Sequence, residues 1–211
     1  PQQQRDWLAP LARGEMLGAF CLTEPHVGSD ASGLRTTAVK DGDEYVINGQ
    51  KVWTSRALFS DLMLLLARTT PLDECKKKSD GLSVFLVDMR EAKGNGMEIR
   101  PLSAMVNHNT TEIFFENLRI PASSLVGEEG KGLKYIMDGM NAERILVGAE
   151  CIGDARWFTD TAVKYVSERR VFDRPIGQNQ GVQFPIAEAY AEMRAADLVL
   201  RRACALFAAG L

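Results

Sequence analysis

The segment TEPHVGSD at residues 23–30, followed by NGQKVWTS at residues 48–55, decides the fold class more than any other part of the 211-residue chain. The first segment ends a short apolar run and continues into a Gly-Ser turn. The second is predicted to close a β-hairpin at Asn48-Gly49, because Asn and Gly tolerate the positive φ angles of tight turns. Both segments therefore predict a β-rich domain.

Short runs rich in β-forming residues surround these two segments. They are GAFCLT, TTAVK, EYVINGQKVWTS, LMLLLART, LSVFLVDM, MEIRPL and TEIFFENLRI. Gly, Asp, Asn and Pro separate them, and Asp41-Gly42 is a second dipeptide typical of tight turns. Regularly spaced short strands of this kind predict an antiparallel barrel or sandwich.

Helical periodicity marks both ends of the chain. Residues 5–17 have apolar positions at helical spacing and a stop at Gly14, and the period of 3.6 returns from about residue 130. We expect one long helix over residues 131–170, a break at residues 175–177 and a second long helix over residues 180–209. The glycines of the first long helix weaken its propensity but permit close helix–helix approach. They are Gly139, Gly148 and Gly153.

Composition excludes several classes of function. The net charge of −3 gives no footprint for nucleic acid, and no stretch is long and apolar enough to span a membrane. The four cysteines lack CxxC spacing, so free thiols are expected, and His26 and His108 have no second histidine at metal-ligand spacing. The chain ends in CALFAAGL, which reads as helix still running, so we expect it to be part of a longer protein.

The two β segments, with ERRVFDRPIGQNQ at residues 168–180, resemble three segments of the acyl-CoA dehydrogenase family in the same order. The resemblance implies an α+β fold, in which a middle antiparallel β-barrel lies between an N-terminal helical domain and a C-terminal helical bundle. Residues 1–18 would end the first domain, residues 19–128 would form the barrel, and residues 129–211 would give the first two helices of the bundle. It also implies FAD as cofactor and assembly into a homodimer or homotetramer.

The resemblance further implies which residues meet FAD. Gly28 lets the backbone come close to a ligand, and the Gly28-Ser29 amides can serve a pyrophosphate. In the family, a Trp at the position of Trp53 packs against the flavin, and a hydroxyl at the position of Ser55 bonds flavin N5. Ser29 also matches a residue near the CoA thioester. The full set of implied FAD contacts is Leu22, Thr23, Gly28, Ser29, Trp53, Thr54, Ser55, Arg169, Phe172 and Gln180. The last three would reach the pyrophosphate and adenosine of an FAD held mainly by a neighbouring subunit.

Glu143 is the candidate catalytic base. Its helical neighbours include Met140, Leu146 and Val147, so it lies on an apolar stripe where a carboxylate is partly desolvated. Such a group suits proton abstraction from carbon, although a buried Glu paired to an arginine is the alternative. Some branches of the family place their catalytic Glu here, in a Glu-Arg pair, while others place it far downstream. Arg144 matches an arginine that contacts CoA, and Glu150 is a weaker candidate base.

The implied activity is FAD-dependent α,β-dehydrogenation of an acyl-CoA thioester to a trans-2-enoyl-CoA. Electron-transfer flavoprotein would be the electron acceptor. Two alternatives stay open: an acyl-CoA oxidase that passes its electrons to oxygen, and a non-catalytic member that serves as an interaction module. The location would be the cytoplasm of a bacterium, or the mitochondrial matrix or peroxisome of a eukaryote.

Overall fold

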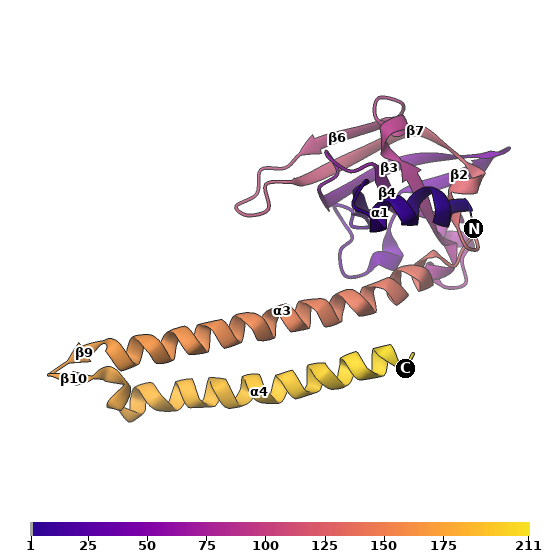
Figure 1. The fold of residues 1–211 in the computed structure, drawn as a ribbon. Coiled ribbons are helices and arrows are strands. Elements are labelled where there is room, and N and C mark those ends of the chain that lie inside the picture. The colour runs from indigo at the N-terminus through magenta and orange to yellow at the C-terminus, as the bar shows by residue number, and fades with distance from the viewer. Residues whose placement is uncertain (1) are drawn as a thin grey trace. The chain divides into compact units, whose positions relative to one another are not determined.

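The computed structural model describes residues 2–211 and divides into two compact units, Pro1–Ile136 and Met137–Leu211 (Figure 1). The first unit holds an eight-stranded sheet, and long helices form the second. The described chain starts with a π-helix, η1 (Gln4–Leu8), which runs directly into α1 (Ala9–Ala12). Gly14 follows with a φ of 69°, so the helix ends just before the predicted stop at Gly14.

The sheet has the strand order β6-β7-β3-β2-β4-β5-β8, and β1 also pairs with β4. The strands are β1 (Gly18–Cys21), β2 (Thr37–Asp41), β3 (Glu44–Ser55), β4 (Leu62–Arg68), β5 (Leu82–Asp88), β6 (Met97–Pro101), β7 (Thr110–Pro121) and β8 (Leu125–Val126). The short helices among them are η2 (Ala31–Gly33), η3 (Leu72–Glu74), η4 (Lys78–Gly81), α2 (Met89–Ala92) and η5 (Ala122–Ser124).

The prediction of a closed antiparallel barrel was wrong. The sheet is open, with β6 and β8 at its two ends, and it is mixed, because β1 and β2 both run parallel to β4. They lie one after the other along the same edge of β4, at Gly18↔Leu62 and at Thr37↔Arg68. The continuous apolar run of β4 is a sequence feature that favours parallel pairing, because strands of parallel sheets are usually buried on both faces.

The open sheet curls around a single apolar core. The rings of Tyr45 on β3 and Phe85 on β5 meet edge to face with centroids 4.8 Å apart, although β2 and β4 lie between them in the strand order. In a flat sheet, three strand spacings would separate them by about 14 Å. The two halves of the sheet therefore face each other, and the core includes Met63, Leu65 and Ile113.

The predicted turn at Asp41-Gly42 is confirmed, since Asp41 pairs with Glu44 and joins β2 to β3. The predicted turn at Asn48-Gly49 is wrong, because β3 continues through it, and the register shifts there because the paired strand β7 has one extra residue. Gly49 has a φ of 146°, and a Cβ there would lie 2.7 Å from the Thr36 Cα. Glycine is needed at this position for a crossing of two backbones, not for a reversal of the chain.

Two long antiparallel helices form most of the second unit (Figure 1). The elements are α3 (Gly132–Glu168), β9 (Arg170–Val171), β10 (Arg174–Pro175), η6 (Ile176–Gln178) and α4 (Gln180–Ala208). The predicted helix limits are confirmed within two residues. Of the three glycines expected to allow close approach, only Gly148 meets a neighbour, because a Cβ there would lie 3.1 Å from Leu200 Cδ1.

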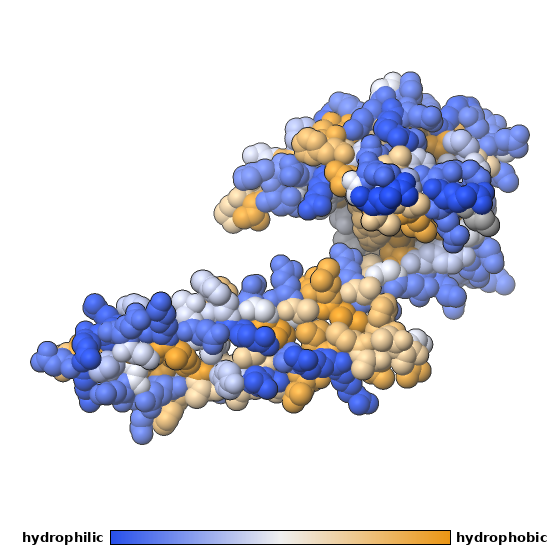
Figure 2. Space-filling model, in the orientation of Figure 1, coloured by the Kyte–Doolittle hydropathy of each residue, from blue (hydrophilic) through white to orange (hydrophobic). Residues whose placement is uncertain are grey.

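The helical pair leaves much apolar surface uncovered. Figure 2 shows hydrophobic residues along both helices, and Leu146, Trp157, Phe158 and Leu198 are each more than 60% exposed. Within residues 2–211, none of the helices combines the length and apolar character that crossing a membrane requires.

Candidate functional site

The structure brings the first two predicted segments into direct contact. The amide of Val52 donates to the carbonyl of Thr23 over 2.9 Å, so residues 22–24 lie beside the second half of β3. The hydroxyl of Thr54 lies 3.5 Å from the Cys21 Sγ, and both side chains are buried. Burial raises the pKa of the Cys21 thiol to about 11, so this cysteine is an inert core residue.

A bulge in β3 turns Trp53 outward. The register with β7 shifts between Lys51 and Thr54, and Trp53 adopts a φ of 62°, which is uncommon for a residue other than glycine. Its indole is 62% exposed. The Oγ of Ser55, also exposed, accepts a hydrogen bond from the Asn107 side chain over 2.9 Å and keeps its own proton to donate. The bulge thus exposes a flat apolar ring, and the Ser55 hydroxyl two residues later can still donate a hydrogen bond.

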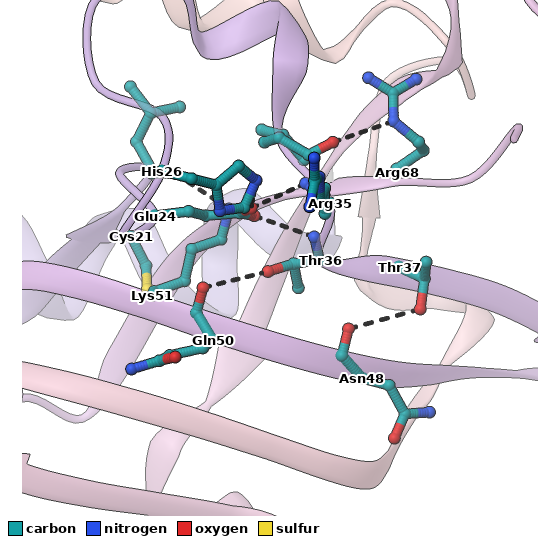
Figure 3. A network of polar contacts seen from close by, with 12 residues as sticks. Cys21, Glu24, His26, Arg35, Thr36, Thr37, Asn48, Gln50, Lys51 and Arg68 are labelled. Carbon is teal, nitrogen blue, oxygen red and sulfur yellow. Dashed lines mark hydrogen bonds and ion pairs between the residues drawn. The ribbon is translucent and has the colours of Figure 1, made fainter. Parts of the chain in front are cut away.

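A buried ion pair between Lys51 and Glu24 lies beneath this surface. It was not predicted from the sequence. Lys51 is fully buried, and its Nζ lies 2.9 Å from Glu24 Oε1 and 2.9 Å from the Leu22 carbonyl (Figure 3). Glu24 also accepts from the amides of Arg35 and Thr36, so its carboxylate joins three segments of the chain. The burial of Lys51 could have been predicted from the sequence. Lys51 lies an even number of residues from Tyr45 and Ile47, so all three side chains lie on the same, buried face of β3.

The charges of this pair support each other. Burial acts to raise the pKa of Glu24. The positive charge of Lys51 and the hydrogen bonds that the Glu24 carboxylate accepts outweigh burial, so the pKa of Glu24 is lowered. Burial lowers the pKa of Lys51, and the nearby Glu24 carboxylate opposes this. Both partners of the Lys51 Nζ are acceptors, so the nitrogen donates both hydrogen bonds, and the Glu24 carboxylate favours its charged form.

The loop after Glu24 has unused backbone donors. Glu24 and Val27 exchange two hydrogen bonds, but the amides of Gly28 and Ser29 reach no acceptor among residues 2–211. Gly28 has no left-handed φ, and a Cβ on it would meet no atom within 4 Å. Neither backbone conformation nor packing within this part of the chain explains a glycine here. A glycine also permits a close approach to the backbone, and two adjacent free amides suit an anion.

A second buried cation that the sequence analysis missed fixes the following turn. Arg68 is 5% exposed, and its Nε donates to the Leu34 carbonyl (Figure 3). Its other two nitrogens donate to the carbonyls of Ser32 and Lys78. The guanidinium thus ties residues 32–34 to the loop before β5 through backbone carbonyls. This holds the far end of the 24–34 loop in place.

The remaining predicted site residues lie in the second unit, and all are exposed. Glu143 lies on α3 with Leu146 and Val147, so its apolar stripe is present but uncovered within residues 2–211. Arg144 donates to the Asn141 side chain over 2.8 Å. Arg169, Phe172 and Gln180 surround the β9–β10 hairpin, and Phe172 is 93% exposed with a φ of 51°. The structure brings these three together at one end of the helical pair.

No group of three or more His, Cys, Asp or Glu residues in the described part of the chain could hold a metal ion. The chemistry available at the β3 surface is therefore that of backbone amides, a hydroxyl and an aromatic ring. These groups suit a flat ligand with acceptor atoms along one edge and an anionic group further along.

Two protein-family models match the chain. They are "Acyl-CoA dehydrogenase, middle domain" over residues 19–118 and "Acyl-CoA dehydrogenase, C-terminal domain" over residues 130–211. Acryloyl-CoA reductase (NADH) of Anaerotignum propionicum is 37% identical over 211 residues, which cover 99% of this chain and 52% of that protein. The chain thus spans about half the length of this relative.

Solved structures give the same picture. Acyl-CoA dehydrogenase from Geobacillus kaustophilus matches with a TM-score of 0.91 and 33% identity, over 99% of this chain and 55% of that one. A structure described as PigA with FAD and proline matches with a TM-score of 0.89 and 29% identity, over 99% of this chain and 54% of that one.

Proposed function

The chain belongs to the acyl-CoA dehydrogenase family, and from this premise we propose that the complete protein is a flavin-dependent oxidoreductase. Its substrates would be an acyl-CoA thioester and the corresponding trans-2-enoyl-CoA. One observation carries the proposal: the segments 22–29 and 51–55 are in contact and offer free amides, a hydroxyl that can donate and an exposed indole.

The residues at this surface fit FAD by their chemistry. The backbone of Leu22 and Thr23 and the hydroxyl of Ser55 would meet the polar edge of the flavin, while Trp53 would cover an apolar face. The free amides of Gly28 and Ser29 would bind the pyrophosphate, with Ser29 also near the thioester arm of the substrate. Thr54 supports this surface from inside the core. FAD, when bound, supplies the acceptor for a hydride from the β-carbon of the substrate.

Proton abstraction is assigned to Glu143. Its carboxylate would accept the proton from the α-carbon, and Arg144 beside it would bind the CoA moiety. Both side chains are exposed and therefore accessible to a substrate. Arg169, Phe172 and Gln180 would contact the pyrophosphate and adenosine of a FAD in a neighbouring subunit of a homodimer or homotetramer. Arg suits this role because its planar fork matches phosphate oxygens.

The direction of the reaction and the electron acceptor are the finer part of the proposal. We favour dehydrogenation with electron-transfer flavoprotein as acceptor, as the family resemblance implies. The name of the relative from Anaerotignum propionicum favours a second candidate, the reduction of an enoyl-CoA, which is the same chemistry in reverse. An oxidase would use the same residues but give its electrons to oxygen.

Anaerobic titration of the full-length protein tests the function. A yellow preparation whose flavin absorbance bleaches with a panel of acyl-CoAs supports the enzyme, and a colourless protein that binds no added FAD supports the interaction module. Bleached flavin that recovers on adding an enoyl-CoA identifies a site that runs in both directions. Peroxide formation in air after adding acyl-CoA identifies an oxidase.

Replacement of Glu143 by Gln tests the base. The variant should bind FAD and acyl-CoA but bleach the flavin more slowly by a factor on the order of 10²–10⁴, because Gln keeps the volume and loses the proton acceptor. Glu150→Gln, one heptad further along α3 and also exposed, is the matched control and should bleach at the parental rate. A parental rate in Glu143→Gln would place the base elsewhere in the full-length protein.

A further inference from the structure

We propose that Lys51 is a positioning residue for the cofactor edge: held by Glu24, its ammonium polarises the Leu22–Thr23 peptide, and the Thr23 amide thereby becomes a strengthened donor toward a ligand. The inference rests on the proposed function for the identity of that ligand, the carbonyl-bearing edge of a flavin. The polarised amide itself rests on contacts within this chain.

The contacts of Lys51 define the direction of the effect. Its Nζ donates over 2.9 Å to the Leu22 carbonyl and over 2.9 Å to Glu24 Oε1, and the side chain is fully buried. A charged donor makes a hydrogen bond about twice as strong as a neutral donor does. In a buried setting each hydrogen bond polarises the next group in the chain of bonds. The Leu22 carbonyl is therefore held by an unusually strong donor.

Peptide geometry carries this polarisation to the other side. The chain has no cis peptide bond among residues 2–211, so the Leu22 carbonyl and the Thr23 N–H point in opposite directions. The cation lies on the carbonyl side, and the amide proton faces away from it. Electron withdrawal through the planar peptide makes that N–H a better donor.

The Thr23 amide has no acceptor within residues 2–211, although its own carbonyl accepts from Val52. Thr23 is half-buried, and nearly all backbone N–H groups removed from water are paired in native proteins. The Thr23 N–H is polarised by the cation on the carbonyl side of its peptide and has no partner on its own side. It is therefore available to an acceptor outside this part of the chain. The neighbouring Trp53 and Ser55 belong to the same surface.

Glu24 compensates the free-energy cost of burying the Lys51 ammonium. An isolated buried charge is strongly destabilising, whereas a pair with further hydrogen bonds is not. The carboxylate is itself fixed by the amides of Arg35 and Thr36, and His26 lies 3.6 Å from its other oxygen. A pair of apolar residues could fill the same volume, so burial alone does not require an ammonium against the Leu22 carbonyl.

The test compares the full-length parental protein with Lys51→Met/Glu24→Gln, in which the pair is neutral and the single Gln oxygen can still accept from one of the two amides, that of Arg35 or that of Thr36. Lys51→Gln is the second variant, which keeps a neutral donor at this position and decides the matter if the double variant does not fold. Tyr45→Phe is the matched control, because Tyr45 lies on the same strand with a buried polar contact that does not involve Leu22.

Three readouts separate polarisation from simple loss of structure. In the protein without FAD, the Thr23 amide proton resonance should move upfield in the Lys51 variants and stay in place in Tyr45→Phe. The Kd for FAD should rise about tenfold, and the midpoint potential of bound flavin should become more negative, because a donor to the carbonyl edge favours the reduced form. Near-UV circular dichroism checks that each variant is folded.

Folded Lys51 variants with the parental Thr23 resonance overturn the polarisation. A shifted resonance with parental FAD affinity and midpoint potential overturns its role toward the ligand. If the parental protein binds no FAD, the proposed function fails and so does the assignment of the ligand, while the resonance still decides whether Lys51 polarises the peptide.

Discussion

At the scale of single residues, Trp53 holds a conformation that its side chain does not favour. A left-handed backbone at a residue other than glycine costs about 1–3 kcal/mol and persists only where its surroundings determine it. Here Lys51 is anchored on one side, and Thr54 accepts a hydrogen bond from the Thr111 hydroxyl over 2.8 Å on the other. The strain coincides with an exposed indole, which is typical of a surface reserved for a ligand.

Tyr45 gives a prediction that depends on pH. Burial raises its pKa to about 12, and the hydrogen bond to Glu129 over 2.7 Å and the charge of that carboxylate act in the same direction. Since this lies above the unfolded value of about 10, the protonated hydroxyl contributes stability that is fully present below pH 10 and is lost as the pH rises through about 12.

Replacement of Tyr45 by Phe should therefore remove this alkaline loss. It should lower the free energy of unfolding at pH 7 by on the order of 1 kcal/mol, because the exposed Glu129 regains water. Urea denaturation of both proteins at pH 7 and at pH 10–11 measures the difference. Equal alkaline losses in the two proteins would contradict the assignment to Tyr45.

At the scale of elements, Gly49 gives a prediction about strand β3. Gly49→Ala should lower the free energy of unfolding by about 2 kcal/mol or more, because the new Cβ would overlap the Thr36 backbone and the φ of 146° is disfavoured. Gly42→Ala is the control: its φ is also positive, at 61°, but no atom lies within 4 Å of a Cβ. Its loss should be about 1 kcal/mol. Equal losses would show that conformation alone, without the crossing, requires Gly49.

The glycines of α3 give a second prediction at this scale. Gly153→Ala should stabilise the protein by about 0.5–1 kcal/mol, because alanine has the higher helix propensity and a Cβ there meets no atom within 4 Å. Gly148→Ala should gain less or lose stability, since its Cβ would press on Leu200 at 3.1 Å. Thermal and urea unfolding of both variants check this. An equal gain at both sites would mean that Gly148 does not control the approach of α4.

At the scale of the whole molecule, the prediction concerns assembly. Arg169→Ala should weaken FAD retention in the full-length oligomer, because its guanidinium would bind the pyrophosphate of FAD in a neighbouring subunit. Arg202→Ala, an equally exposed change of charge on α4, should leave retention unchanged. Flavin content after dialysis, together with sedimentation, measures both effects. A monomer with full FAD affinity would contradict the proposal.

Features that depend on neighbours within a few residues could be predicted from the sequence. It predicted the limits of α3 and α4 and the turn at Asp41-Gly42, because helical periodicity and tight-turn chemistry are local properties. It also identified the family through three short segments whose order is visible in one dimension.

The pairing of the strands and the contents of the core depend on contacts between residues that are far apart in the sequence. Alternation of side chains does not encode the partner of a strand, so the parallel pairing of β4 and the open sheet were not predicted. The chain continues as a strand through Asn48-Gly49 where it packs closely against Thr36. Lys51 can be buried because the Glu24 carboxylate, 27 residues earlier, pairs with it. A polar group is buried only where distant partners satisfy it, and those partners are set by the fold.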